Sequence, residues 1–229
     1  MALRALAAAL SLNSHHHRAR TWQCLIFYHV GLLEEAKGGL DEVLAGNPDD
    51  TLTLTMLGQT AFCKGEYEEA EKHHARALAI DPGGVWGNLW SPTAPLYGND
   101  LERAEKKIRA SIQIFPEDPM LNSCQALLWA KRGERSKALQ TVHRALRCGR
   151  PLVHTHHVWH MAAATFAVLE KPAQAVNLLR KASGLGLPNY PLFRNDPHFK
   201  PLHADPPFLG MLADLKHDWE SYRREFGRP

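Results

Sequence analysis

The stretch TLTLTMLGQTAFCKGEYEEAEKHHARALAIDP, residues 51–82, predicts two helices joined by a tight turn. Glycine ends helices well, so Gly65 separates the two segments. Proline disfavours helical geometry in the residue before it, so Asp81-Pro82 ends the second segment. Residues at helical spacing give each segment its packing face: Leu54, Leu57, Ala61 and Phe62 before the turn, then Tyr67, Ala70, His74, Ala77 and Leu78 after it.

The same arrangement recurs along the chain with a period of 34 residues. The turn prolines Pro48, Pro82 and Pro116 define this period. Four further columns follow it, and they are small or turn-forming at most positions: Ala36, Ala70, Ala104 and Ala138; Val43, Ala77, Ser111 and Ala145; Gly31, Gly65 and Gly133; and, more weakly, Leu33, Tyr67, Leu101 and Arg135. Small residues such as Gly58, Ala70 and Ala77 would let two helix backbones approach closely. The period therefore predicts a stack of similar helix pairs.

These columns resemble the tetratricopeptide repeat (TPR) pattern over residues 1 to about 187. The resemblance implies an all-α fold, a right-handed α-solenoid of helix-turn-helix repeats, because one pair cannot bury its apolar face alone. We expect residues 1–14 to be the second helix of a truncated repeat and residues 15–187 to hold about five pairs. Residues 188–229 would form a linker and a C-terminal capping helix.

The first helix of the third pair departs from the pattern. Its sequence, VWGNLWSPTAPLYGND (85–100), contains Pro92 and Pro95. Proline inside a helix removes a backbone hydrogen bond and clashes with the preceding turn. We expect a kinked and shortened helix or a loop here, either in a decayed repeat or at a functional hinge.

The two ends of the chain differ. Leu3, Leu6 and Leu10 lie on an amphipathic segment that no preceding helix covers, so we expect either a missing upstream region or a second copy against it. At the other end, Asp196-Pro197 and Asp205-Pro206 are typical helix starts. The last helix, about 207–226, carries one apolar stripe, which favours a capping role over a coiled coil: Phe208, Leu212, Leu215, Trp219, Tyr222 and Phe226.

Residues 150–229, with NYPLF, NDPHF and DPPF, resemble the C-terminal part of TPR arrays in bacterial signalling proteins that carry a serine/threonine kinase or a cyclase domain. That resemblance implies an array attached to a catalytic domain. The four cysteines show no CxxC spacing, which indicates free thiols in a reducing compartment, and we therefore expect a cytoplasmic protein. Within this sequence there is no kinase motif.

The segment HTHHVWH (154–160) holds four histidines on the predicted first helix of the fifth pair. The 34-residue register places His154 and His157 on the concave face, and a register fitted to the following helix places His157 and His160 there. We favour a groove-lining helix. The alternative is a metal-binding site or metalloenzyme centre built from His156, His157 and His160, because residues three or four apart meet on a helix surface.

The concave face of a TPR array is the surface on which we expect a peptide to bind. The residues that we predict to line it are Arg18, Thr21, Tyr28, Thr55, Gln59, Phe62, Ser123, His154 and His157. This face is neutral and partly apolar, and it lacks the Lys/Asn set with which chaperone-adaptor TPR domains grip a carboxylate. An extended or helical peptide with apolar side chains fits it better.

Composition excludes several functions. The net charge of +3 is too small to indicate nucleic acid, and no apolar run is long enough to span a membrane. No phosphate-binding glycine loop or nucleophile motif is present, so we predict no catalytic residue and no cofactor. The sequence indicates a non-catalytic scaffold with a protein or peptide partner, and self-association through the N-terminal helix is an alternative.

Overall fold

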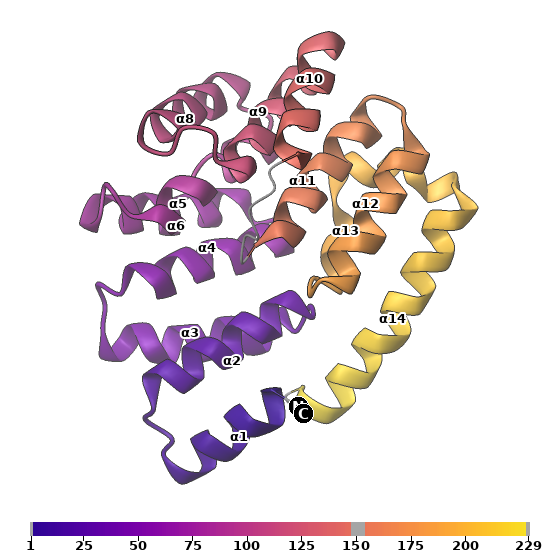
Figure 1. Ribbon diagram of the computed structural model, residues 1–229. Coiled ribbons are helices and arrows are strands. Elements are labelled where there is room, and N and C mark those ends of the chain that lie inside the picture. The colour runs from indigo at the N-terminus through magenta and orange to yellow at the C-terminus, as the bar shows by residue number, and fades with distance from the viewer. Residues whose placement is uncertain (1, 148–153, 228–229) are drawn as a thin grey trace.

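The computed structural model describes residues 2–147 and 154–227, which are helical and contain no strand. Antiparallel helices stack pair after pair along a curve (Figure 1). This all-α repeat solenoid confirms the predicted fold class. In chain order, α1 (Ala2–Leu12) is followed by the pairs α2 (His17–His29) with α3 (Leu33–Gly46), α4 (Thr51–Lys64) with α5 (Tyr67–Ile80), α6 (Val85–Trp90) and α7 (Thr93–Tyr97) with α8 (Leu101–Ile114), α9 (Pro119–Lys131) with α10 (Arg135–Leu146), and α11 (Thr155–Val168) with α12 (Pro172–Gly184).

The small-residue columns mark where helices touch. Each alanine of the main column, Ala36, Ala70, Ala104 and Ala138, is completely buried. In the fifth pair the equivalent residue is Ala175, which lies 37 rather than 34 residues after Ala138 and is also completely buried. Gly58 shows why a small residue is required at such a contact, because a Cβ atom at this position would lie 2.3 Å from Nε2 of His74.

The glycine column supplies left-handed backbone at the turns. Gly31, Gly65 and Gly133 have φ values of 82°, 81° and 78°. The third pair has no glycine in this column, yet Asn99 occupies the equivalent position with φ 67°. Asparagine is among the few residues that tolerate this conformation, so the turn geometry is kept in all four pairs.

Pro92 and Pro95 divide the first helix of the third pair into α6 and α7, with Ser91 and Pro92 between them. The broken helix is still a core element, because Trp90, Ala94 and Leu96 are buried. The side chain of Ser111 in α8 stabilises it by donating a hydrogen bond to the carbonyl oxygen of Asn88 at 2.9 Å.

Three further elements follow the fifth pair: α13 (Tyr190–Asn195), the 3₁₀ helix η1 (Pro197–Ala204) and α14 (Pro206–Phe226). Both Asp-Pro pairs start helices. The Asp196 carboxylate accepts a hydrogen bond from the His198 amide at 2.9 Å, and the Asp205 carboxylate accepts one from the Phe208 amide at 3.0 Å. These caps satisfy backbone donors that would otherwise lack partners.

Helix α14 does more than cap the fifth pair. It runs down one side of the molecule and ends beside α1, so that the first and last helices lie together (Figure 1). Trp219 Nε1–H donates to the Gly31 carbonyl at 2.9 Å, and the rings of Phe27 and Phe226 lie 6.5 Å apart. An ion pair joins Arg4 to Glu225 at 2.8 Å.

The same arrangement buries much of the leucine face of the N-terminal helix. Leu3 and Leu10 are only 8% and 7% exposed, and Leu6 is half-buried. Leu3 belongs to the main hydrophobic core, against which Tyr222 and Phe226 of α14 pack. The chain therefore covers most of the leucine face itself, because α2 and α14 lie against α1. Among the described residues, no helix is long and apolar enough to cross a membrane.

Candidate functional site

An apolar cavity of about 340 Å³ opens between α2, α4 and α6. Its walls come from the first helix of three successive pairs and from the start of α11, as expected for the concave side of a TPR array. The residues that line it are Thr21, Trp22, Leu25, Leu52, Thr55, Met56, Gln59, Trp86 and His154. Four of them, Thr21, Thr55, Gln59 and His154, are among the residues that we predict from the sequence to contact a peptide.

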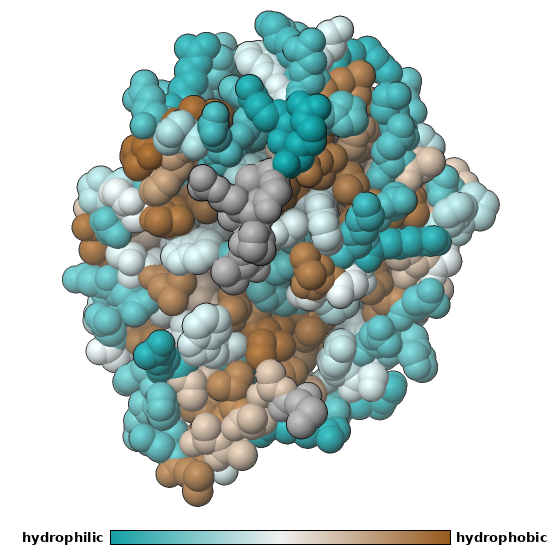
Figure 2. Space-filling model, viewed as in Figure 1, coloured by the Kyte–Doolittle hydropathy of each residue, from teal (hydrophilic) through white to brown (hydrophobic). Residues whose placement is uncertain are grey.

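The rim of this cavity exposes large apolar side chains. Trp22 is 49% exposed and Leu52 is 40% exposed. Val85, which is 47% exposed, lines a smaller cavity of about 70 Å³ that also touches Leu52 and Trp86. Figure 2 shows that hydrophobic side chains also gather over the lower part of the drawn face, where α1 and α2 lie in Figure 1.

The other predicted groove residues do not line the cavity. Tyr28, Phe62, Ser123 and His157 are at most 4% exposed and are part of the interior. Arg18 is exposed but is not a lining residue of this cavity. The predicted open groove is partly filled, because α11 lies in the middle of the molecule with most of its side chains buried (Figure 1).

Four histidines meet behind the cavity. His29 at the end of α2 lies against His154, His156 and His157 at the start of α11, and one ring nitrogen of each lies within 4.8 Å of the others. The Nε2 atom of His29 is 3.2 Å from Nε2 of His156 and 3.2 Å from Nε2 of His157. The hydroxyl of Tyr28 is 2.7 Å from Nε2 of His157.

Burial keeps these imidazoles neutral. It is the main cause that lowers the pKa of His29 and His157 well below the ordinary value, and repulsion between neighbouring imidazoles adds to it. The pKa of His156 is lowered to about 4, and that of His154 is lowered by burial as well. Neutral imidazole is the form that binds metal ions.

His160 does not join this cluster, which corrects the predicted set of His156, His157 and His160. Its Nε2 atom lies 2.9 Å from a carboxylate oxygen of Asp196. The other oxygen of Asp196 lies 3.0 Å from Nδ1 of His198, and Tyr97 donates its hydroxyl proton to Asp196 at 3.1 Å. Burial alone would raise the pKa of Asp196, but the hydrogen bonds from His160 and His198 outweigh it and lower the pKa.

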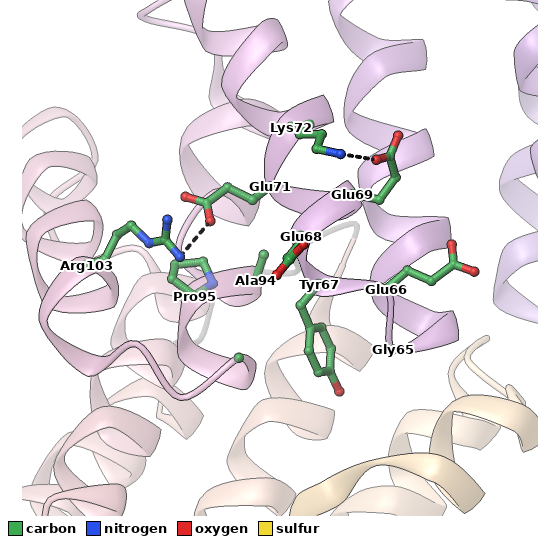
Figure 3. A pocket seen from close by; sticks show the side chains of 11 residues that line it. Gly65, Glu66, Tyr67, Glu68, Glu69, Glu71, Lys72, Ala94, Pro95 and Arg103 are labelled. Atoms are coloured by element: carbon green, nitrogen blue, oxygen red, sulfur yellow. Dashed lines mark hydrogen bonds and ion pairs between the residues drawn. The ribbon is translucent and has the colours of Figure 1, made fainter.

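A second, more polar cleft of about 560 Å³ lies between α5, α7 and α8 (Figure 3). Its lining includes four glutamates, and three of them, Glu66, Glu69 and Glu71, have basic partners. Glu69 lies 3.0 Å from Lys72, and Glu71 lies 3.3 Å from Arg103 (Figure 3). Surface pairs of this kind contribute little to binding or stability, and we assign this cleft no function.

Sequence reasoning missed His29, although it chose the adjacent Tyr28. His29 is 128 residues away from His157, and the 34-residue pattern relates only neighbouring pairs. The sequence did offer one signal, because a histidine at the end of a predicted first helix could contribute a metal-binding nitrogen beside another helix. Only the curvature of the whole array brings α2 and α11 together.

No family model and no curated protein sequence match the chain. Solved structures do match. A thermophilic TPR protein from Thermus thermophilus is 19% identical with a TM-score of 0.60, over 90% of this chain and 97% of that one. A TPR protein from Parabacteroides merdae is 15% identical with a TM-score of 0.65, over 93% of this chain and 76% of that one. A chain of the APC/C hetero-tetramer Cut9–Hcn1 is 14% identical with a TM-score of 0.63, over 96% of this chain and 42% of that one.

At identities this low, the structural similarity establishes the fold but not the activity. The structural match nevertheless extends over nearly the whole chain, and it agrees with the repeat columns that the helices bury. The protein therefore has the fold of tetratricopeptide repeat proteins.

Proposed function

We propose that the protein is a non-catalytic interaction scaffold that binds an apolar side chain of a peptide segment in the cavity between α2, α4 and α6. The observation that carries this proposal is the exposure of Trp22 and Leu52 at that cavity, together with that of Val85 at the smaller cavity beside it. Exposed apolar side chains grouped at a concavity are typical of binding surfaces.

The chemistry of the cavity defines its ligand. Its polar lining atoms come from Thr21, Thr55, Gln59 and His154, and none of its lining residues is charged at neutral pH. The hydroxyls of Thr21 and Thr55 already donate to the carbonyls of His17 and Thr51, at 3.0 and 2.8 Å. Gln59 and His154 are therefore the main polar groups for hydrogen bonds to a peptide. The cavity therefore fits an uncharged aromatic or branched aliphatic side chain.

A library of short random peptides displayed on phage tests this proposal directly. Peptides selected on the wild-type protein should share an aromatic or aliphatic anchor residue. Leu52→Glu should weaken them by at least about tenfold, because the ligand would bury an unpaired carboxylate. Leu52 lies in the first turn of α4, where a negative charge is favourable, so the variant should fold normally.

Leu209→Glu is the matched control, since Leu209 is 48% exposed and also lies in the first turn of a helix, α14. Its affinity for the selected peptides should equal that of the wild type. The proposal fails if no peptide is enriched, or if both glutamate variants bind the enriched peptides equally well.

We further propose that the scaffold works in the cytoplasm as part of a larger signalling protein. This proposal rests on the resemblance of residues 150–229 to arrays that accompany kinase or cyclase domains. An antibody against residues 207–229 should then detect a native polypeptide well above 25.7 kDa in source cells. A band at 25.7 kDa would contradict it.

A further inference from the structure

The four-histidine cluster contains more ring nitrogens than hydrogen bonds can satisfy. A neutral imidazole nitrogen either donates or accepts, and it has a single site for doing so. Tyr28, His157, His29 and His156 form a row of three short contacts, of 2.7, 3.2 and 3.2 Å. At most two of these three contacts can be hydrogen bonds at once. Nδ1 of His154 is also buried without a hydrogen-bond partner among the described residues.

The distances match those of a metal site. In a tetrahedral zinc centre with Zn–N bonds of about 2.0–2.1 Å, two ligand nitrogens lie about 3.3–3.4 Å apart. The Nε2 atom of His29 lies 3.2 Å from Nε2 of both His156 and His157. One ion could therefore accept three lone pairs that now face one another, and His154 offers a fourth nitrogen within 4.8 Å.

We propose that His29, His154, His156 and His157 form a binding site for a divalent transition-metal ion, with Zn²⁺ as the ion that fits the donor set best. Imidazole ligands suit Zn²⁺, Cu²⁺, Ni²⁺ and Co²⁺, whereas Mg²⁺ and Ca²⁺ require oxygen ligands. This site adjoins the peptide cavity proposed above and shares His154 with it, but metal binding does not depend on the binding of a peptide.

The surroundings support this assignment. His156 forms a hydrogen bond with the backbone of Leu185, and ligand histidines in metal sites are commonly oriented by such a contact. The rings of Trp86 and Trp90 pack edge-on against His154 and His157, with centroids 4.5 and 4.7 Å apart. His154 also lines the apolar cavity, which gives an ion a route from solvent.

The ion would join two distant elements. His29 ends α2, and the other three histidines lie at the start of α11. His156, which contacts His29, is 127 residues further along the chain. Metal binding would therefore hold the first complete helix pair against the fifth. Binding should raise the melting temperature of the folded chain, because the unfolded chain does not bring these ligands together.

The test must separate this site from the exposed run His15-His16-His17, which can bind metal ions by itself. The background variant is therefore His15→Gln, His16→Asn and His17→Gln. Asparagine at position 16 keeps an acceptor for the Ala19 amide, which His16 now caps at 3.2 Å. Calorimetric titration of this variant with ZnCl₂ at neutral pH should give one ion per chain.

Adding His29→Gln or His156→Gln to the background should weaken Zn²⁺ binding by at least about 100-fold and abolish the rise in melting temperature. His217→Gln, at an exposed histidine of α14, should change neither. The proposal is overturned if the background variant binds no Zn²⁺, or if the His29→Gln and His217→Gln variants bind it equally.

Cobalt provides a second readout that needs no variant in the cluster. Co²⁺ bound to the background variant should show the intense visible absorption of tetrahedral coordination, and Zn²⁺ should displace it. A weak octahedral spectrum would overturn the proposed site even if the glutamine variants failed to fold.

Discussion

At the scale of single residues, the buried polar side chains differ in how many hydrogen bonds they form. Asp196 has hydrogen bonds from Tyr97, His160 and His198. His74 is completely buried, and the backbone of Thr55 only partly offsets the effect of this burial on its imidazole. Its imidazole lies instead against Gly58, where only a residue without a side chain leaves room for it. The two sites should therefore respond differently to protonation.

We predict that stability depends on pH through His74. Burial lowers its pKa to about 3, whereas an unfolded histidine titrates near 6.5. Between these values the unfolded chain binds a proton that the folded chain does not, so stability falls as the pH falls below about 6.5. At pH 5 this loss is about 2 kcal/mol for His74 alone.

His74→Leu should remove this contribution. The free energy of unfolding can be measured with guanidinium at pH 7 and pH 5. Relative to the wild type, the free energy of unfolding of the variant should be about 2 kcal/mol higher at pH 5 than at pH 7. His217→Gln is the exposed control and should keep the pH dependence of the wild type. Equal pH dependence in the wild-type and His74→Leu proteins would contradict the prediction.

At the scale of helices, the sequence predicted most of what the structure contains. The alanine and glycine columns mark helix contacts and turns because each repeat meets its neighbour in the same way. Even the exceptions follow physical rules: Asn99 takes the left-handed turn conformation in place of glycine, and Pro92 breaks α6 from α7. The fifth pair shifts by three residues, and Glu170 then occupies the left-handed turn with φ 59°.

The turn glycines give a prediction about helix ends. Gly65 has φ 81°, and a Cβ atom there would have nothing within 4 Å. Gly65→Ala should therefore cost only the backbone strain of the left-handed conformation, about 1–2 kcal/mol. Gly184 is equally open but has no left-handed backbone, so Gly184→Ala should be neutral or stabilise α12 by up to about 1 kcal/mol. Urea unfolding should show a lower free energy of unfolding for Gly65→Ala and an equal or higher one for Gly184→Ala. An equal loss of stability in both variants would contradict the prediction.

At the scale of the whole molecule, sequence reasoning missed the contacts between elements that are distant in the chain. It placed Tyr28, Phe62, Ser123 and His157 on an open groove, although all four are buried. The curvature of a repeat array is the sum of small rotations between neighbours, and a 34-residue pattern does not encode contacts between its first and last elements. The histidine cluster and the contacts of α14 with α2 both arise from this curvature.

We predict that Trp219 protects the other end of the chain. Trp219→Ala removes the hydrogen bond to the Gly31 carbonyl and the packing that this partly buried ring provides. Amide hydrogen exchange in α1 and α2 should therefore become faster, although the substitution lies in α14. Trp129→Ala, at a half-buried tryptophan of α9, should accelerate exchange only around α9 and α10. Unchanged exchange in α1 and α2 of the Trp219 variant would contradict the prediction.

The contact between α14 and the first helices also determines how the array responds to force. Helical-repeat arrays can bend like springs, because each repeat touches only its neighbours. Here any bending that widened the curve would have to separate Phe27 from Phe226 and break the hydrogen bond from Trp219 to the Gly31 carbonyl. We therefore expect these contacts to stiffen the array, so that the proposed peptide would bind a surface whose shape is already set. Little binding energy would then go into reshaping the protein, so selectivity would depend on how well the peptide itself fits.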